Sequence, residues 1–335
     1  MLIWYRAWEI KQGEERMRRK LGIDTGKYAT KCVMKRSREY NETDKELKFL
    51  SRMDNKDTDF GLLNGNTYMV EYNGKKYRIG ENATYDSFIE SKAEEIHKVC
   101  LYTAVALTVD NDDSVVIGIG CPLSIFINKE ERNKYRQYMM GDKDITITIG
   151  GKKHHFCIEN ILVLPESSGV VYLHLEKYKD KTVGVIDLGG LNTNCGVYKN
   201  ITPVLTTLFT TRLGGKVMRK QLLDLLNERL GMEVPLQDFQ MDEVLKNGYV
   251  RNRKDSLKEQ ASRKLIHDYK YQHIKDIYDE CIKHNWPLDT MDLIFIGGTS
   301  LFLINEIKEV FGVDDDSFFE DADMLNAKGF LRALG

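Results

Sequence analysis

One local pattern occurs twice in this chain, and it limits the possible folds more than any other feature. The segment "LGIDTGKYATKC" (21–32) is typical of a strand, a turn beside Asp24 and a returning strand. The segment "VGVIDLGGLNTNCGVY" (183–198) repeats this order around Asp187. Repetition of one structural unit indicates an internal duplication. The sequence therefore predicts two related hairpins, one in each half of the chain, with turns that face each other.

The rest of the chain mixes strands and helices in both halves. Asn73-Gly74 and Gly150-Gly151 predict the turns of two more hairpins, the second followed by another strand. Further strands are expected at 114–123 and 182–190, and a strand, a glycine turn and a helix at 291–312. Helical spacing is found in four segments: 87–109, 129–140, 216–286 and 321–335. This order predicts an α/β protein with helices packed on sheets.

Length and composition set the broad class. A chain of 335 residues exceeds one ordinary core, so two domains, or one domain split into two lobes, are expected. A net charge of -2 does not favour direct nucleic-acid binding, and no apolar run is long enough to cross a membrane. Six scattered cysteines without a CxxC pair indicate reduced thiols in a cytoplasmic protein.

The two turns combine glycines with a carboxylate. Glycine lets the backbone approach a ligand closely and point N–H groups at anionic oxygens. A carboxylate beside a phosphate requires a cation, so Asp24 and Asp187 are predicted to hold Mg²⁺, directly or through water. A third glycine turn, "FIGGTS" (295–300), lies between a strand and a helix whose N-terminus could face a nucleotide.

Two common nucleotide-binding motifs are absent from the sequence. The segment "GIDTGK" (22–27) is one residue shorter than a Walker A loop, and Tyr28 follows it in place of Ser or Thr. No G-x-G-x-x-G opens a helix after a strand, which disfavours a dinucleotide-binding fold. The phosphate site is therefore expected to be built from the two hairpins.

With this arrangement the chain resembles the actin/Hsp70/sugar-kinase superfamily. The segments "IDTGKYATK", "VIDLGGLNTN" and "IFIGGTSLF" are similar to its first phosphate loop, second phosphate loop and adenosine motif. The segments "GIGCPLSIF" and "ILVLPESSGVVY" are most similar to the plasmid-segregating bacterial actins, the ParM/StbA family. The resemblance implies an actin-like (ribonuclease H-like) duplicated fold, with two lobes around a nucleotide cleft.

The resemblance begins at about Met17 and implies a division of the chain. Lobe I is expected over 17–182, with a small subdomain at about 52–108 and a C-terminal helix from 313–335. Lobe II is expected over 183–312, with a helical subdomain at about 213–289. Residues 1–16 are interpreted as an N-terminal extension.

The resemblance also implies roles for individual residues. Glu166, in "LPES", is expected to orient the water that attacks the γ-phosphate, although a surface turn would explain this residue equally simply. Asp24 and Asp187 are expected to hold Mg²⁺ through water. Lys31 is expected to reach the β- and γ-phosphates, with Lys27 as a competitor. The other nucleotide contacts are expected from Thr25, Gly26, Gly189, Gly190, Gly214, Gly215, Gly297, Gly298 and Thr299.

One position departs from the family pattern. Leu191 stands where a small hydroxyl residue would follow the glycines of the second loop. Either Asn192 or Thr193 is expected to supply the polar contact, or the contact is absent. Gly214 and Gly215 are the weakest assignment, because glycines before a helix also fit plain capping.

The function implied by the resemblance is an ATPase that needs Mg²⁺ and polymerises head to tail with ATP. Such filaments separate plasmid copies through a ParR-like adaptor bound to centromeric DNA, without direct contact to nucleic acid or membrane. Three alternatives stay open. The first is a small-molecule kinase, which would need a second acidic site. The second is an Hsp70-like chaperone, which would need a β-rich substrate domain. The third is a non-segregating cytoskeletal actin.

Two other features have plainer interpretations. His154, His155 and Cys157 alternate along a hairpin strand, which favours edge-strand positions over a metal site. The acidic run at 313–323 lacks the EF-hand pattern, so it is expected to be a solvated loop or a filament contact.

Overall fold

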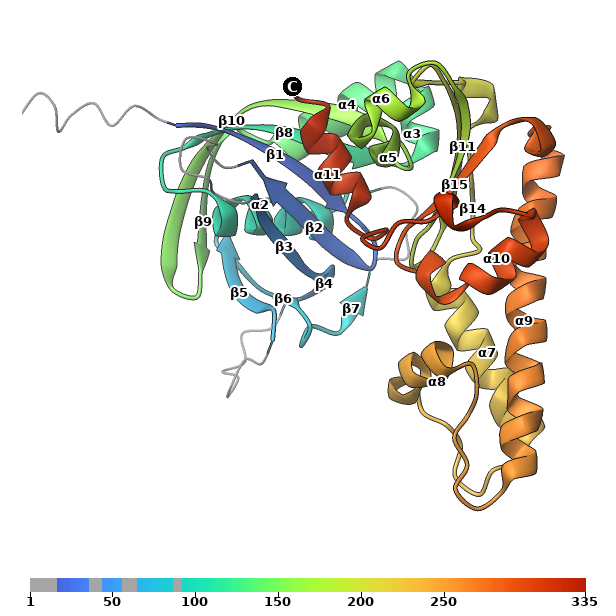
Figure 1. Cartoon of the computed structure of the whole chain (residues 1–335). Helices are drawn as coiled ribbons and strands as arrows, with labels where there is room; N and C mark the ends of the chain where they lie inside the picture. The colour runs from blue at the N-terminus through green and yellow to red at the C-terminus, as the bar shows by residue number, and fades with distance from the viewer. Residues whose placement is uncertain (1–16, 36–43, 56–64, 87–91) are drawn as a thin grey trace, which may run out of the picture.

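The computed structural model describes residues 17–35, 44–55, 65–86 and 92–335. Within these residues the strands form two sheets, which lie side by side in Figure 1, and long helices extend away from the second. The α/β class expected from the sequence is confirmed. The segment 1–16, interpreted above as an extension, lies outside the described residues.

The first sheet is built around three parallel neighbours, β1 (Arg18–Thr25), β8 (Ser114–Cys121) and β10 (Lys152–Pro165). Every residue of β8 is buried, as expected for a strand covered on both faces. In the described part of the chain the full order is β3 (Lys45–Leu50), β2 (Ala29–Met34), β1, β8, β10, β9 (Asp144–Ile149), β5 (Thr67–Tyr72), β6 (Lys75–Gly80), β4 (Arg52–Asp54) and β7 (Tyr85–Asp86).

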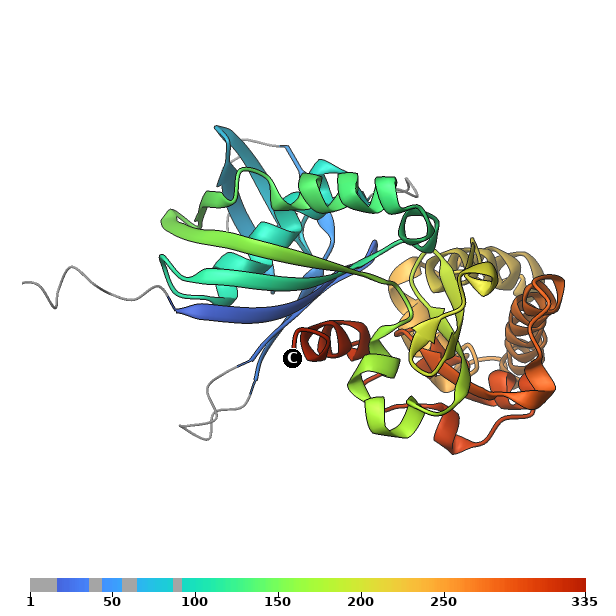
Figure 2. The ribbon, with the colours of Figure 1, turned by 90° about the horizontal axis from the view of Figure 1, so that it is seen from above.

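The two faces of this sheet meet different helices. Leu21 and Ile23 of β1 pack in the core that contains α2 (Glu95–Thr108). Gly22, between them, faces α11 (Leu325–Arg332), and a Cβ at this glycine would lie 2.0 Å from the Ala327 carbonyl oxygen. The absence of a side chain therefore lets the helix backbone rest directly on the strand. Figure 2 shows α11 beside the first sheet, next to the second half of the molecule.

The second sheet has the order β13 (Thr202–Pro203), β12 (Thr193–Lys199), β11 (Thr182–Leu188) and β15 (Asp292–Ile296), with β14 (Phe209–Thr211) paired to β12. One face packs in a large core with α7 (Gly215–Leu230), α9 (Ser256–Lys283) and α10 (Ile304–Phe311). The other face packs with α5 (Gly169–Leu173) and α6 (Leu175–Tyr178).

The helices α5 and α11 cross with their backbones in contact. A Cβ at Gly329 of α11 would lie 1.8 Å from the carbonyl oxygen of Gly169 in α5. Because α11 rests on the first sheet and α5 on the second, this crossing joins the two halves of the molecule.

The two sheets share one arrangement at their centres. The hairpin β1–β2 is antiparallel, and β8 runs parallel to β1. The hairpin β11–β12 is likewise antiparallel, and β15 runs parallel to β11. In the first hairpin Asp24 is opposite Lys31, and in the second Asp187 is opposite Asn194. The repeated pattern in the sequence is therefore a repeated structural unit.

Several local predictions are confirmed. Asn73 and Gly74 both have positive φ at the turn between β5 and β6. The charged helix is α4 (Lys129–Met140), which follows the short α3 (Leu123–Ile127). Gly231 ends α7 in the left-handed conformation that suits glycine at a helix C-terminus.

Other boundaries differ from prediction. The hairpin at Gly150-Gly151 is not followed by a separate strand, because β10 continues through an irregularity between Ile158 and Asn160 to Pro165. A short 3₁₀ turn at Ser300–Phe302 separates the third glycine turn from α10, so that helix does not start at the turn. The tail helix begins only at Leu325, and α2 only at Glu95, with 87–91 outside the described residues.

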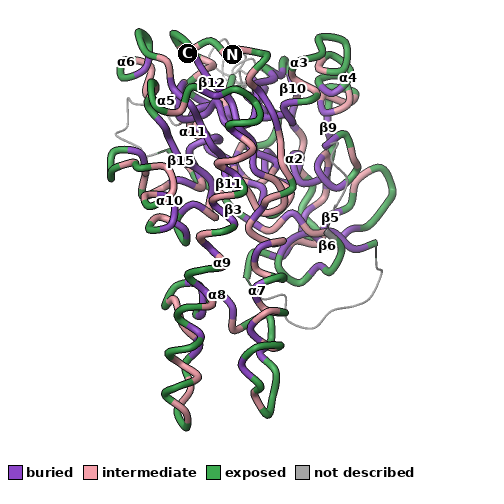
Figure 3. Tube along the Cα trace, turned by 90° about the vertical axis from the view of Figure 1, so that its right-hand side faces the viewer, coloured by how far each residue is buried: buried purple, intermediate pink, exposed green. Residues whose placement is uncertain are grey.

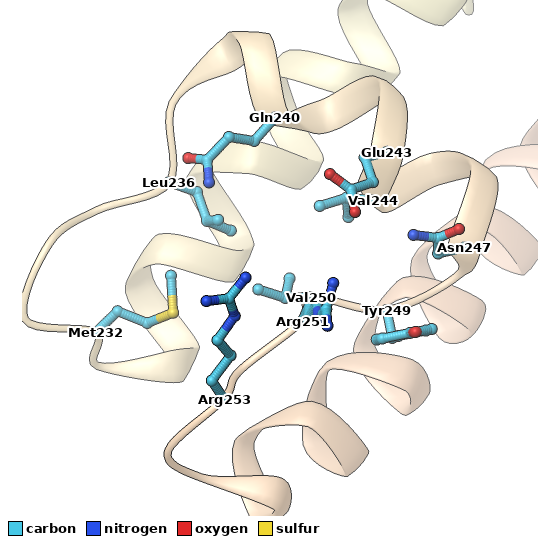
Figure 4. A pocket seen from close by; sticks show the side chains of 10 residues that line it. All are labelled: Met232, Leu236, Gln240, Glu243, Val244, Asn247, Tyr249, Val250, Arg251 and Arg253. Carbon is cyan, nitrogen blue, oxygen red and sulfur yellow. The ribbon is translucent and has the colours of Figure 1, made fainter.

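The helices α7 and α9 extend beyond the second sheet and enclose a small core with α8 (Met241–Asn247). Figure 3 shows that this end of the molecule is mostly exposed or half-buried, whereas burial concentrates around the sheets. A cavity of about 290 Å³ lies here, lined by apolar side chains such as Met232, Leu236 and Val244 and also by Arg251 and Arg253 (Figure 4). None of the predicted site residues lines it, so the site of interest lies elsewhere. No helix within the described ranges is both long and apolar enough to span a bilayer.

Candidate active site

The turns of the two related hairpins meet. A Cβ at Gly190, in the second turn, would lie 2.7 Å from the Cβ of Tyr28 in the first. With the Asn192 amide oriented so that both its groups have partners, its oxygen accepts a hydrogen bond from Lys27 Nζ at 3.2 Å. The structure therefore brings the Asp24 and Asp187 hairpins together across the gap between the sheets.

The first hairpin surrounds its carboxylate with ammonium groups. Asp24 is 5% exposed at the end of β1, and its Oδ2 lies 3.2 Å from Lys31 Nζ, on the opposite strand. Its Oδ1 lies 3.8 Å from Lys92 Nζ. Burial alone would raise the pKa of Asp24, but the charges of Lys31 and Lys92 outweigh burial and hold this pKa below its usual value. Asp24 is therefore ionised and neutralised by the protein itself.

The second hairpin leaves its carboxylate without such a cation. Asp187 is 7% exposed, and its Oδ2 accepts a hydrogen bond of 2.8 Å from the amide of Asn326 in α11. Burial, and next the negative charge of Asp24, raise the pKa of Asp187 to about 6, although Lys31 and Asn326 partly oppose the shift. The position therefore favours an added positive charge.

Glu166 follows the last residue of β10 and joins the two halves of the site. The residue is 7% exposed, and its Oε1 lies 2.5 Å from Lys92 Nζ. Its Oε2 accepts a hydrogen bond of 2.8 Å from the amide of Asn194, which itself accepts one from Thr210. Glu166 is therefore a buried carboxylate with one ion pair and one hydrogen bond, and it does not lie in an exposed surface turn.

The residue after Glu166 fixes the local backbone. Ser167 has a φ of +77°, a conformation that is uncommon outside glycine. Its hydroxyl is hydrogen-bonded to the hydroxyl of Tyr198 at 3.0 Å, and both groups are buried. This turn directs the chain from β10 into α5 and leaves Glu166 facing the two hairpins.

The predicted glycine positions of the second half interlock. The Gly215 N–H donates to the Gly189 carbonyl at 3.0 Å, and the Thr299 hydroxyl donates to the same carbonyl at 3.1 Å. A Cβ at Gly215 would lie 2.2 Å from Thr299 Oγ1, and one at Gly214 would lie 2.1 Å from the Leu191 carbonyl carbon. The second hairpin turn, the start of α7 and the third glycine turn are therefore one packed unit.

The remaining predicted residues lie around this unit. Gly297 has a φ of +86°, and a Cβ there would lie 2.4 Å from the Leu188 carbonyl oxygen. Gly298 is more open, since its nearest neighbour would be Asp323 Cβ at 3.5 Å. In the first turn Gly26 lies against the Ala29 carbonyl, and Thr25 is fully buried.

The departure at Leu191 has a simple structural answer. The Thr193 hydroxyl donates to the Leu213 carbonyl at 2.6 Å, so it is used within the second half. Asn192 instead pairs with Lys27 of the first turn. Of the two residues considered, Asn192 is therefore the one that supplies a polar group between the hairpins.

Sequence reasoning missed three polar residues of this site, Lys92, Asn194 and Asn326. Asn194 carried a usable signal, because it follows Asp187 by the same spacing as Lys31 follows Asp24. Lys92 and Asn326 carried none, since both reach the site from elements far away in the chain.

The donor set suits a hard divalent cation. Asp24, Glu166 and Asp187 place three buried carboxylates near the buried ammonium group of Lys92 and the partly buried one of Lys31. Carboxylate oxygens are the ligands that Mg²⁺ prefers, and Mg²⁺ keeps several waters and substrate oxygens rather than a full protein cage. In the part of the chain that the structure describes, no three His, Cys, Asp or Glu side chains form a group that could hold a metal by themselves, so water and phosphate oxygens would have to supply the other ligands.

Comparison with known proteins identifies the architecture. Residues 22–169 match the family model described as "Actin like proteins N terminal domain". No curated protein sequence matches the chain.

Three solved structures illustrate the similarity over nearly the whole chain. An Alp12 filament structure is 28% identical, with a TM-score of 0.69, and the match covers 94% of this chain and 98% of that one. The archaeal actin homolog Ta0583 in complex with ADP is 19% identical, with a TM-score of 0.71 and the same coverage. A 15-stranded ParM filament from Clostridium botulinum is 18% identical, with a TM-score of 0.72 over 95% of this chain and 99% of that one.

The family match and the fold agree with the arrangement of the paired hairpins and confirm the actin-like, duplicated fold expected from the sequence. The chain therefore has an actin-like fold, its residues 22–169 match the N-terminal domain of actin-like proteins, and it is similar in structure to ParM and Alp12 proteins.

Proposed function

We propose that this chain is an ATPase that binds ATP between its two sheets and assembles into filaments. The observation that carries the proposal is the meeting of Asp24, Glu166 and Asp187 where the two hairpin turns face each other. A nucleotide bound there would touch both halves of the molecule at once. Its hydrolysis could therefore change how the halves are held together, and with it the stability of a filament.

The contacts of the site residues suggest which part of the nucleotide each would bind. Lys31 is the better candidate for the β- and γ-phosphates, because it is partly buried and paired with Asp24, whereas Lys27 reaches across to Asn192. Gly297, Gly298 and Thr299 are proposed to border the adenosine, and Gly214 and Gly215 to touch the ribose or base. The phosphate cradle is proposed to consist of Thr25, Gly26, Gly189 and Gly190. When bound, Mg²⁺ would neutralise phosphate charge, held through water by Asp24 and Asp187.

Glu166 is proposed to act on the attacking water. A buried carboxylate with fixed orientation can accept a hydrogen bond from water and align it with the terminal phosphorus. Oε2 accepts one hydrogen bond, from Asn194, and Oε1 is in an ion pair with Lys92 without accepting a hydrogen bond, so the carboxylate, which has about four acceptor sites, keeps acceptor capacity.

Assembly follows the example of the related structures, two of which are filaments. A head-to-tail contact between copies does not close on itself and therefore generates a filament. Loss of the γ-phosphate would loosen the link between lobe I (17–182 with 313–335) and lobe II (183–312), and so weaken the contact. We propose that these filaments separate plasmid copies in the cytoplasm through a ParR-like adaptor bound to centromeric DNA.

The test is 90° light scattering of the purified protein after addition of ATP and Mg²⁺, with phosphate release followed in parallel. Wild type is expected to give a rise and a decay, and Glu166→Gln a rise that persists. Glu159→Gln, on the same strand but half-exposed and paired with Arg18, is the matched control and should behave as wild type.

Two outcomes would count against the proposal. Phosphate release without scattering at any protein concentration would exclude the filament and direct attention to small-molecule acceptors, as for a kinase. Scattering that is unchanged by chelation of Mg²⁺ and by removal of ATP would show assembly independent of the site.

A further inference from the structure

A buried lysine lies between two of the carboxylates, and neither the family pattern nor the assignments above give it a role. Lys92 precedes α2, and its side chain is only 4% exposed. Its Nζ lies 2.5 Å from Glu166 Oε1 and 3.8 Å from Asp24 Oδ1. An ammonium group is rarely buried unless it is paired, so these two carboxylates account for its position.

Lys92 completes a set of contacts that fixes Glu166 from both sides. The lysine holds Oε1 from the first half of the molecule, and Asn194 holds Oε2 from the second. The hydrogen bond at Oε2 and the ion pair at Oε1 together restrict rotation of this carboxylate, and Oε1 keeps its lone pairs free of hydrogen bonds.

The same contact joins Glu166 to the first hairpin. Lys92 lies between Glu166 and Asp24, and Asp24 is in turn paired with Lys31. The water-orienting carboxylate and the first phosphate turn are thereby held in one ion-pair chain.

We infer that Lys92 is a positioning residue that aims Glu166 at the attacking water, a role that rests on the ATPase function proposed above. In that reaction the water oxygen forms a bond to the terminal phosphorus while the bond from phosphorus to the bridging oxygen breaks. The water proton passes to Glu166, and the nucleoside diphosphate leaves with the bridging oxygen. Lys92 keeps its proton throughout and acts through Glu166, so it affects alignment rather than nucleotide binding.

The first test separates alignment from binding. Lys92→Met removes the charge but keeps an unbranched side chain of similar length, and we expect kcat for ATP hydrolysis to fall about 10- to 100-fold. The KM, and the Kd of a fluorescent ATP analogue measured by direct titration, should stay within about threefold of wild type. Lys92→Arg, which keeps a cation, should recover part of the lost kcat.

Lys270→Met is the matched control. Lys270 also forms a buried pair, with Glu306 at 3.7 Å between α9 and α10, away from the site. Its loss should leave kcat, KM and nucleotide affinity unchanged. A raised KM and Kd with unchanged kcat in Lys92→Met would overturn the inference and make Lys92 a phosphate-binding residue instead.

The second test asks whether Lys92 acts through Glu166. If it does, the double variant K92M/E166Q should hydrolyse ATP at the rate of E166Q alone in single-turnover experiments. Rates that fall by the product of the two single effects would show an independent role and overturn the inference. Should K92M unfold because it leaves Glu166 buried and unpaired, E166Q should restore the melting temperature, and the double variant still gives the comparison.

The two levels of proposal fail in different ways. A wild-type chain that hydrolyses no ATP would remove the proposed function and this inference with it. A wild type that hydrolyses ATP, together with K92M at the wild-type kcat, would remove the inference alone.

Discussion

The two hairpins of the site have the same architecture and opposite electrostatics. In the first, the residue opposite Asp24 is Lys31, and the pKa of the carboxyl group is lowered despite its burial. In the second, the residue opposite Asp187 is Asn194, and burial together with the charge of Asp24 raises the pKa of Asp187 to about 6. The equivalent position is Lys31 in the first hairpin and Asn194 in the second. This difference leaves Asp24 paired with a cation and Asp187 without one on the opposite strand.

The difference indicates a division of labour within a duplicated unit. The first hairpin carries its own cations and is prepared for the negative charge of a phosphate. The second hairpin uses its amide to hold Glu166, and leaves Asp187 with a hydrogen bond from Asn326. The two hairpins share one backbone arrangement, and the residue type at the equivalent position, Lys31 or Asn194, distinguishes their chemistry.

The largest effect is expected from removing the cation of the first hairpin. Lys31→Met leaves Asp24 with only the more distant Lys92, and breaking a buried ion pair costs about 3–5 kcal/mol in general. We expect the affinity for ATP to fall at least about 100-fold, measured by titration with a fluorescent ATP analogue. Lys270→Met, which breaks a buried pair outside the site, should leave affinity unchanged. Affinity within a factor of three of wild type in Lys31→Met would refute the proposed role of the first hairpin.

The next effect concerns stability and pH in the second hairpin. Because the pKa of Asp187 is raised to about 6 in the folded state, ionisation of this group destabilises the fold. The penalty is absent well below pH 4, grows between about pH 4 and 6, and is constant above, at roughly 1–3 kcal/mol. Asp187→Asn should therefore be more stable than wild type at pH 7.5 in urea unfolding without nucleotide. The difference should shrink steadily as the pH falls from 6 to 4.

Asp292→Asn provides the control for this experiment. Asp292 lies half-exposed on the neighbouring strand β15, paired with Lys181. The stability difference of this variant from wild type should not change between pH 4 and 6. A pH-independent difference for Asp187→Asn would mean that the carboxyl group is not perturbed, and the contrast between the hairpins would be lost.

A smaller effect is expected from the amide of the second hairpin. Asn194→Ala removes the hydrogen bond to Glu166 Oε2 and leaves only the ion pair with Lys92, and a hydrogen bond to a charged group contributes about 1.5–3 kcal/mol. We expect kcat to fall about tenfold or more, with KM within about threefold. Asn160→Ala, an exposed asparagine on β10, should have no effect in the same steady-state assay. An unchanged kcat in Asn194→Ala would show that this contact does not help to aim Glu166.

The smallest effect is expected from the contact between the two turns. Lys27 and Asn192 form one hydrogen bond near the surface, and such contacts are worth at most about 1 kcal/mol. Lys27→Ala should weaken ATP binding by less than about fivefold in the titration used for Lys31. A loss as large as that of Lys31→Met would reverse the assignment of the two lysines.

The sequence predicted the parts of this site that depend on local pattern. The hairpins, their facing turns and the positions of Asp24 and Asp187 follow from short stretches in which strand spacing and glycine placement agree. The start of α10 was predicted too early, because propensity alone does not reveal a 3₁₀ turn between a glycine turn and a helix. Lys92 and Asn326 could not be predicted, since their places depend on how α2 and α11 pack on the first sheet.

The crossing of α5 and α11 has a consequence for the history of this chain. Gly329 lies so close to the Gly169 backbone that a methyl group could not be accommodated without moving one helix. The neighbouring Asn326 also donates to Asp187 and accepts from the Gly169 N–H, so moving the helix would disturb the site as well. Every substitution at Gly329 would add at least a Cβ at this contact, so we expect each to disturb the packing of the two helices. We expect the residues of this helix crossing to change more slowly in evolution than the exposed surface residues. They should stay recognisable in relatives whose other residues have diverged.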